Sequence, residues 1–180
     1  MAAAMAEQAA DTAGVADVRL RELVAYWAGL RGDRAAPPRA ALDPAGMLAL
    51  LPWVALLDVQ QDGFQLRLAG TALEAICGRS LTGVRLAQPA VDGIDPDLLD
   101  WLRHACHARV PLSLQAVVTT RRGPGRLQAV ILPLSSDGES VDKLLCGCVP
   151  VGGMRSGGAL FRRDDPALAL TNVTAITLMV

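Results

Sequence analysis

Two cysteines separated by one glycine, Cys146 and Cys148, form the pattern with the greatest potential for chemistry in this sequence. Side chains alternate along a β-strand, so both thiols would lie on one face, about 7 Å apart along the chain. A structural zinc site needs four ligands at characteristic spacing, and the sequence offers no second cysteine pair. The pattern therefore favours two cysteines of a hydrophobic core over a metal site.

The two histidines, His104 and His107, lie on a helix predicted over residues 95–109. At helical spacing both fall opposite an apolar face, which comprises Leu98, Leu99, Leu102, Ala105 and Cys106. The histidines should therefore contact water rather than a buried haem iron. Cys106 points inward and could touch a ligand, although a buried thiol that packs as a small apolar group is favoured.

The remaining polar motifs do not assemble a catalytic site. Ser135, Ser136 and Asp137 precede a glycine and are explained by turn chemistry, and no inward histidine is available to act as a base. The glycine-rich residues 152–158 do not connect a strand to a helix in a βαβ unit, so they are not a phosphate-binding loop. We therefore expect a protein that is not an enzyme.

The elements that must position these residues are centred on a hairpin that follows Pro52. Two runs of alternating apolar residues flank Asp62-Gly63, a dipeptide that favours a two-residue turn. This register predicts three facing pairs: Val59 with Leu66, Leu57 with Leu68, and Asp58 with Arg67. A short helix over residues 71–77, ended by Gly78, should follow.

An amphipathic helix is predicted over residues 17–31, after a disordered N-terminus at residues 1–15. Its apolar stripe consists of Leu20, Leu23, Val24, Trp27 and Leu30. This stripe must cover either the domain's own sheet or the same helix of a second subunit. A further short helix should begin at Asp43-Pro44 and stop before Pro52.

Three strands are predicted to close the domain, over residues 111–121, 126–135 and 143–151. Pro133 suits an edge or a bulge, whereas the last strand is apolar on both faces and should be central. No helix joins these strands, so they should form an antiparallel meander. Five antiparallel strands with helices packed on one face make an α+β domain, and residues 79–94 should be loops.

These elements divide the chain into a disordered start (1–15), an N-terminal helical segment (16–51), one domain (52–151) and a tail (152–180). The end of the tail is strand-prone, and it could add a strand, dock on a groove or pair with a partner. The formal net charge of -1 argues against nucleic acid. We expect a cytoplasmic protein with reduced cysteines, because no signal peptide or bilayer-spanning stretch is evident.

The order strand, strand, short helices, longer helix and three strands resembles that of a PAS domain. Short motifs resemble, in order and spacing, a family of short bacterial proteins that carry one PAS domain and little else. These motifs, within about residues 20–150, are Trp27-Ala-Gly-Leu-Arg31, Pro38-Arg39, Asp43-Pro44, Leu50-Leu51-Pro52, Arg67-Leu68-Ala69-Gly70-Thr71, Gly78 with Leu81-Thr82-Gly83, and Leu132-Pro133-Leu134-Ser135-Ser136-Asp137-Gly138. The resemblance implies a five-stranded antiparallel sheet in the order 2-1-5-4-3 with a cavity between sheet and helices. It also implies sensing or partner binding, often as a homodimer through an N-terminal helix.

We therefore predict a non-catalytic sensor or adaptor in signal transduction that binds a small, mostly apolar ligand or a protein partner. The predicted cavity lining is Leu57, Leu68, Leu73, Ile76, Leu98, Leu102, Cys106, Leu114, Val118 and Leu132. Binding would change how the helix at residues 17–31 docks. No cofactor is expected, and the alternative is a haem or flavin sensor. Light-sensing flavin domains of similar layout carry a reactive cysteine near Cys77, but their Asn-Cys-Arg motif is absent.

Overall fold

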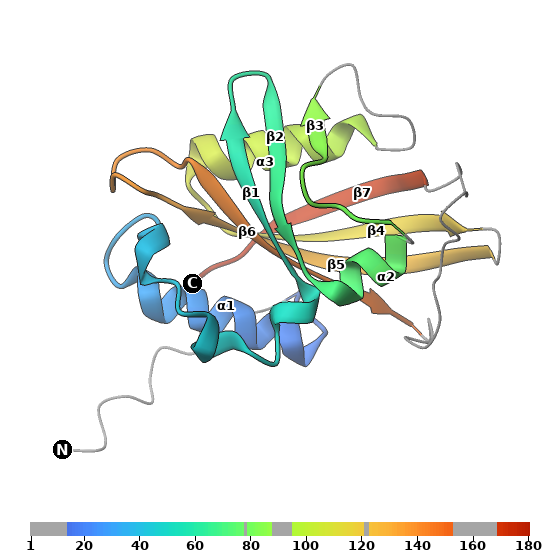
Figure 1. The fold of residues 1–180 in the computed structure, drawn as a ribbon, viewed down its shortest axis with the longest axis horizontal. Helices are drawn as coiled ribbons and strands as arrows, with labels where there is room; N and C mark the ends of the chain where they lie inside the picture. Colours follow the sequence, from blue (N-terminus) through green and yellow to red (C-terminus); the bar gives the residue numbers. More distant parts are fainter. Residues whose placement is uncertain (1–13, 78, 88–94, 121–122, 153–168) are drawn as a thin grey trace.

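The computed structural model in Figure 1 describes residues 14–77, 79–87, 95–120, 123–152 and 169–180. Helices, short 3-10 turns and strands follow one another along this part of the chain. In order they are α1 (Val18–Arg31), η1 (Arg39–Ala41), η2 (Pro44–Met47), η3 (Leu51–Trp53), β1 (Val54–Gln60), β2 (Gly63–Ala69), α2 (Thr71–Cys77), β3 (Arg85–Ala87), α3 (Pro96–Ala108), β4 (Leu112–Thr120), β5 (Gly123–Leu134), β6 (Lys143–Val151) and β7 (Ala169–Thr177). The predicted helix stop at Gly78 and most of the glycine-rich run lie outside the described residues.

The strands form one antiparallel sheet in the order β3-β2-β1-β6-β5-β4-β7. Its five central strands, β2-β1-β6-β5-β4, have the predicted order 2-1-5-4-3. The prediction of five strands is nevertheless wrong, because β3 and β7 extend the sheet at its two edges. β3 falls within residues 79–94, where we expected loops, and β7 shows that the strand-prone C-terminus adds a strand.

The two strands at the middle of the sheet are β6 and β5. β6 lies between β1 and β5, as its apolar residues on both faces predict. β5 is also an interior strand, so Pro133 does not mark an edge strand. Pro133 pairs with Leu144 of β6 but lies beyond Ile131, the last residue of β5 that pairs with β4. The proline is tolerated because β5 no longer pairs with β4 at this position, so no backbone N–H is needed on that side.

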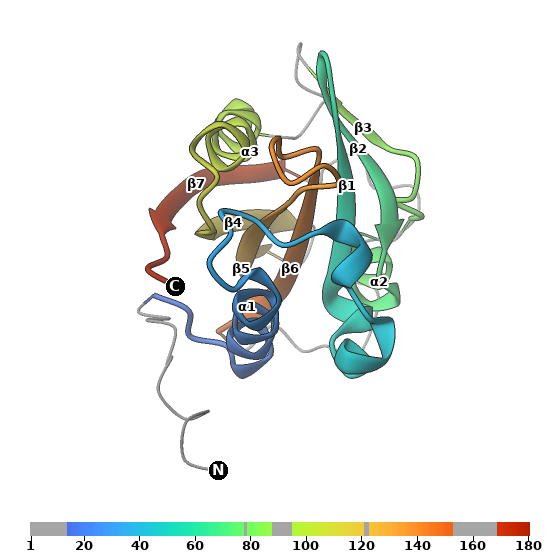
Figure 2. The ribbon, with the colours of Figure 1, turned by 90° about the vertical axis from the view of Figure 1, so that its left-hand side faces the viewer.

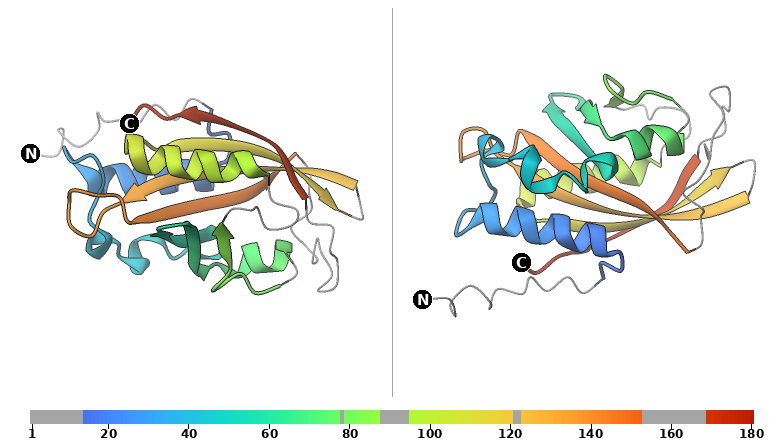
Figure 3. Two further views of the ribbon diagram at one scale, coloured as in Figure 1. Left: turned by 90° about the horizontal axis from the view of Figure 1, so that it is seen from above. Right: turned by 60° about the horizontal axis from the view of Figure 1, so that its bottom comes forward.

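Helices cover both faces of the sheet, which we call the inner and the outer face (Figure 2). α3, α2 and the curled β1–β2–β3 end enclose the inner face, whereas α1 packs on the outer face. Figure 3 shows α1 lying across the sheet on the side opposite α3. The expectation that helices pack on one face is therefore corrected. The apolar stripe of α1 covers the domain's own sheet, which was one of the two alternatives left open.

Capping residues set the starts of both long helices close to the predicted positions. The carboxylate of Asp17 accepts the backbone N–H of Arg19 at 2.9 Å and so caps α1. The carboxylate of Asp95 accepts the backbone N–H of Asp97 at 3.0 Å and caps α3. Gly32 ends α1 with a positive φ of 57°, a conformation that glycine adopts without steric cost.

The β1–β2 hairpin forms where it was predicted, but its register differs. Its two-residue turn consists of Gln61 and Asp62, so Gly63 already belongs to β2. A Cβ on Gly63 would collide with the carbonyl oxygen of Leu86, so glycine is required for the close approach of β3. The observed pairs are Val59 with Phe64, Asp58 with Gln65, Leu57 with Leu66, and Leu56 with Leu68.

A one-residue bulge at Arg67 separates the last two of these pairs, because Leu66 and Leu68 face consecutive residues of β1. The predicted contact between Asp58 and Arg67 still forms, with 3.0 Å between Oδ2 and Nε. The other carboxylate oxygen of Asp58 lies 3.2 Å from the Nζ of Lys143 on β6. The predicted ion pair between Asp58 and Arg67 thus forms, although the observed register differs from the one that Asp62-Gly63 predicts.

Both ends of the described chain pack beside α1. Val15 is 4% exposed, and the side-chain oxygen of Gln128 accepts the backbone N–H of Ala16 at 3.0 Å. After β7, Leu178 is buried in the outer cluster, where it joins Val15. The predicted disorder of residues 1–15 is therefore wrong at its last two positions, whereas residues 1–13 lie outside the described ranges.

Candidate functional site

The central strand β6 contributes alternate residues to the two faces of the sheet. Leu144 and Cys146 belong to the inner cluster, and Cys148 packs against it. Leu145 and Val149 belong to the outer cluster, beneath α1. Neighbouring residues of β6 thus contact the inner cluster and the cluster beneath α1.

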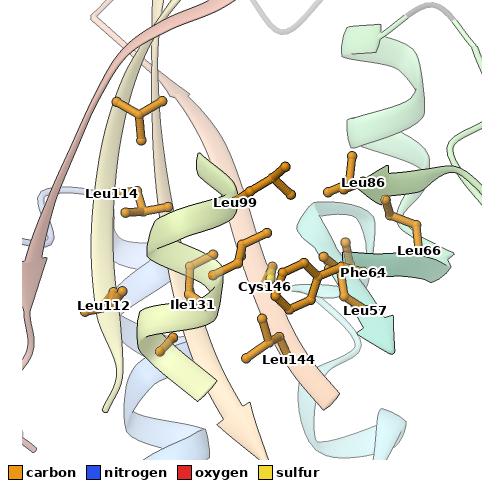
Figure 4. Close-up of a cluster of buried hydrophobic side chains, with 14 of the residues drawn as sticks. Leu57, Phe64, Leu66, Leu86, Leu99, Leu112, Leu114, Ile131, Leu144 and Cys146 are labelled. Atoms are coloured by element: carbon orange, nitrogen blue, oxygen red, sulfur yellow. The ribbon is translucent and has the colours of Figure 1, made fainter. Parts of the chain in front are cut away.

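The inner cluster is the candidate ligand site, and Figure 4 shows its side chains converging between α3 and the strands. It is built from leucines, an isoleucine, a phenylalanine and small residues. Six predicted lining residues belong to it or pack against it: Leu57, Leu73, Leu98, Leu102, Cys106 and Leu114. Two more, Ile76 and Val118, form a small neighbouring cluster with Trp53 and Leu127. These eight lie on the predicted side of the sheet.

The other two predicted lining residues, Leu68 and Leu132, do not lie in the inner cluster. Leu68 is 48% exposed, because the bulge at Arg67 turns it to the outer side with Leu56. Leu132 is fully buried, but in the outer cluster. Its neighbour Ile131 takes the inner position on β5.

The four cysteines are free thiols positioned by α2, α3 and β6. Burial raises the pKa of Cys77 to about 11 and the pKa values of Cys106 and Cys148 to about 12. Burial also raises the pKa of Cys146, and the nearby Cys148 and Cys106 add to this effect. All four are therefore protonated at neutral pH and pack as small apolar groups.

Both histidines of α3 are exposed, as the helical phase predicts. The ring of His104 stands edge-on to that of Trp101, with 6.0 Å between ring centroids. Within the described part of the chain, no three potential metal ligands lie close enough together to hold an ion. A haem iron at the inner face would therefore find neither histidine of α3 beside it.

The serine motif after β5 forms a turn. The carboxylate of Asp137 accepts the hydroxyl of Ser135 at 2.9 Å and the backbone N–H groups of Glu139 and Ser140 at 2.8 and 2.9 Å. These hydrogen bonds hold the pKa of Asp137 well below its usual range. The motif is thus a structural turn, which agrees with its interpretation from the sequence.

The docking of α1 is close and specific. Four of its five predicted stripe residues, Leu20, Leu23, Val24 and Trp27, are buried against the outer face, and Leu30 is half-buried. The indole N–H of Trp27 donates to the carbonyl oxygen of Pro133 at 2.7 Å. A Cβ placed on Gly147 would lie 2.6 Å from Cδ2 of Leu23. The domain's own sheet covers this stripe, and the homodimer through the N-terminal helix stays a prediction.

Several inner-face residues were missed by the sequence analysis. They are Phe64, Leu66, Leu86, Leu99, Leu112, Ile131, Leu144 and Val173. The helical phase of α3 already placed Leu99 on the inward side, so it could have been included. Leu86 and Val173 lie on strands that the sequence analysis did not assign, and no periodicity in those short segments identified them.

The fold and the comparisons together identify the class of protein. The strand order of the curled sheet and the helix across its inner face agree with the PAS resemblance. A family model for the PAS domain matches residues 15–149 of the 180-residue chain, so the chain belongs to the PAS domain family. The matched segment includes α1, and membership indicates a sensory or signalling module. Comparison with curated proteins and with solved structures gives no match.

None of the helices in the described ranges is long and apolar enough to cross a bilayer.

Proposed function

We propose that this PAS domain is a non-catalytic cytoplasmic sensor that binds a small, mostly apolar ligand at its inner face and transmits binding to α1. One observation carries the proposal: consecutive residues of β6 belong to the inner cluster and to the cluster beneath α1. Cys146 and Cys148 face the candidate ligand site, while Gly147 between them supports Leu23. A single strand thus connects the site of recognition to the element that would report it.

The chemistry of the inner face defines the ligand class. Leucine side chains and protonated thiols provide apolar surface and no charge. Burying an ionised ligand there would cost several kcal/mol without a partner charge, so the ligand should be uncharged. The cofactor-bearing alternative gains no support from α3, whose histidines face away from this cluster.

The proposed mechanism is a shift between two dockings of α1. A ligand changes the populations only as far as it binds one arrangement better than the other. Leu20 and Leu23 pack closely against Gly147. A small displacement of β6 would therefore favour a different position of α1 on the sheet. A signalling partner would then recognise the position of α1.

Native mass spectrometry and an absorption spectrum of freshly purified protein test this proposal. We expect a colourless protein with a mass excess that disappears on denaturation. Cys106→Phe, which fills the rim of the inner face, should remove this excess, whereas Leu68→Phe at an exposed position should retain it. A visible band would support a haem or flavin sensor instead. Equal retention by both variants would contradict binding at the inner face.

A further inference from the structure

α3 and β7 border a groove of about 550 Å³ at one margin of the sheet. α3 lines it with Asp97, Asp100, Trp101 and His104, and β7 lines it with residues 173–175. Figures 2 and 3 both show α3 and β7 side by side in this region. Trp101 is half-buried against the inner cluster, so its indole is held in place while part of it remains exposed.

The carboxylates that line this groove favour a positively charged ligand group. Asp97 and Asp100 present two exposed carboxylates, and Arg103 forms an ion pair with Asp100 at 3.0 Å. Among the described residues no ion pair forms at Asp97. A carboxylate beside an indole recognises an ammonium or guanidinium group, through an ion pair and through the face of the ring. The same carboxylates repel an anionic ligand.

The adjoining strand β7 offers backbone groups as well. It is the outermost strand on its side of the sheet, and within the described ranges it pairs with β4 alone. Its nine residues include no charge and no proline, whereas the opposite edge strand, β3, has three residues. Proteins commonly protect sheet edges by charges, prolines or short length, and β7 lacks these devices. An edge of this kind accepts an extended peptide as an added strand.

We propose that the groove and the β7 edge together bind an extended, basic segment of a protein partner. The segment adds a strand to β7, and one of its arginine or lysine side chains enters the groove between Asp97, Asp100 and Trp101. Alternate side chains of an added strand point to the same face, so a strand on β7 can direct such a side chain toward α3. This site is separate from the ligand site at the inner face and does not depend on it.

Peptide libraries with one fixed central residue test the proposal on the full chain. The flanking positions vary among Val, Ile, Thr and Ala, and the central residue is arginine, lysine, citrulline or glutamate. We expect the immobilised protein to retain arginine and lysine peptides about tenfold more than citrulline peptides, because citrulline has a similar shape without the charge. Equal retention of arginine and citrulline peptides would overturn the proposal.

A matched pair of double variants locates the binding site. Asp97→Asn with Asp100→Asn should reduce retention of arginine peptides to the citrulline level. Glu22→Gln with Asp33→Asn changes the net charge equally at exposed positions elsewhere and should leave retention unchanged. Circular dichroism checks that both variants fold. An equal loss in the two would show that only overall charge matters, and it would contradict a site at the groove.

Hydrogen exchange tests the strand addition. The best arginine peptide should slow exchange of β7 amides by about tenfold or more and leave β3 amides unchanged. Binding without protection of β7 would show a cation site alone and overturn the peptide proposal. Native mass spectrometry and hydrogen exchange of the peptide-free protein test whether a second copy of this chain occupies the β7 edge. A dimer with protected β7 amides would overturn the peptide proposal and assign the edge to that second copy.

Discussion

The two faces of the central sheet are packed in different ways. On the outer face, Gly147 leaves room only for Leu20 and Leu23, and the indole of Trp27 is anchored to a backbone carbonyl. On the inner face, leucines meet the small thiol side chains of Cys146 and Cys148. The outer face thus holds one helix close to the sheet, whereas the inner face combines large aliphatic side chains with small thiols. In the proposed mechanism, the inner face binds the ligand and the helix on the outer face changes its position.

The largest effect is expected from Leu23→Asp, which places a carboxylate in the outer cluster. Leu23 is 1% exposed, so the charge would be buried without a partner. We expect a loss of about 3–5 kcal/mol in the free energy of unfolding, measured by urea denaturation. Val18→Asp, at a 55% exposed position of the same helix, should be nearly neutral. Unchanged stability and association in Leu23→Asp would exclude α1 as the docked transmission element.

A smaller but still large effect is expected from Leu102→Ala at the inner face. Leu102 is 2% exposed and lies in the inner cluster, so truncation leaves a cavity beneath α3. The free energy of unfolding should fall by about 2–5 kcal/mol. Leu98→Ala, at a half-buried position of the same helix, should cost less. Equal costs in the two variants would argue against a tightly packed inner cluster.

Gly147→Ala tests the packing of β6 on the outer face, next to α1. The added methyl group would meet Cδ2 of Leu23 at 2.6 Å and Cδ2 of Leu20 at 2.9 Å, so these two side chains of α1 must move. We expect a loss of about 1–3 kcal/mol in the free energy of unfolding. Tryptophan fluorescence should report a changed environment of Trp27. Cys148→Ala, at the next residue but on the inner side, should leave that fluorescence unchanged, and the opposite pattern would contradict the assignment of the two faces.

The last prediction concerns pH and the thiols of the inner face. Cys77, Cys106 and Cys148 have folded-state pKa values of about 11 to 12, above their ordinary value of 9.0. The unfolded chain therefore loses thiol protons first as pH rises, so the contribution of the thiols to stability should be constant below about pH 9 and should fall between there and about pH 12. Urea midpoints measured across this window check the trend. Cys106→Ala should reduce the alkaline loss, and an unchanged loss would show that other groups cause it.

Local signals in the sequence were sufficient to predict most helices and strands. They did not show what each apolar face packs against. Asp17 and Asp95 are capping residues, and they located the starts of α1 and α3 almost to the residue. The apolar stripe of α1 could not reveal what covers it, because a sheet and a second helix demand the same pattern. Only the folded chain shows that the sheet lies there.

The two misplaced lining residues have separate physical causes. Leu132 lies in a run of apolar residues on β5, where alternation is lost and the face of each residue cannot be assigned. Leu68 follows a bulge, and one extra residue reverses the face of every position beyond it. The predicted side of the sheet was wrong for the two residues where strand alternation was lost or broken, whereas the ligand contact of all ten residues stays a prediction.

In the proposed mechanism, a change at the inner face reaches α1 through β6. In Leu102→Ala, benzene should enter the apolar cavity left by the truncated side chain. The indole N–H resonance of Trp101, which packs against the inner cluster, confirms that benzene has bound, and that of Trp27 reports the outer face. We expect both resonances to shift on addition of benzene to Leu102→Ala. A shift of Trp101 with an unchanged Trp27 would contradict transmission across β6.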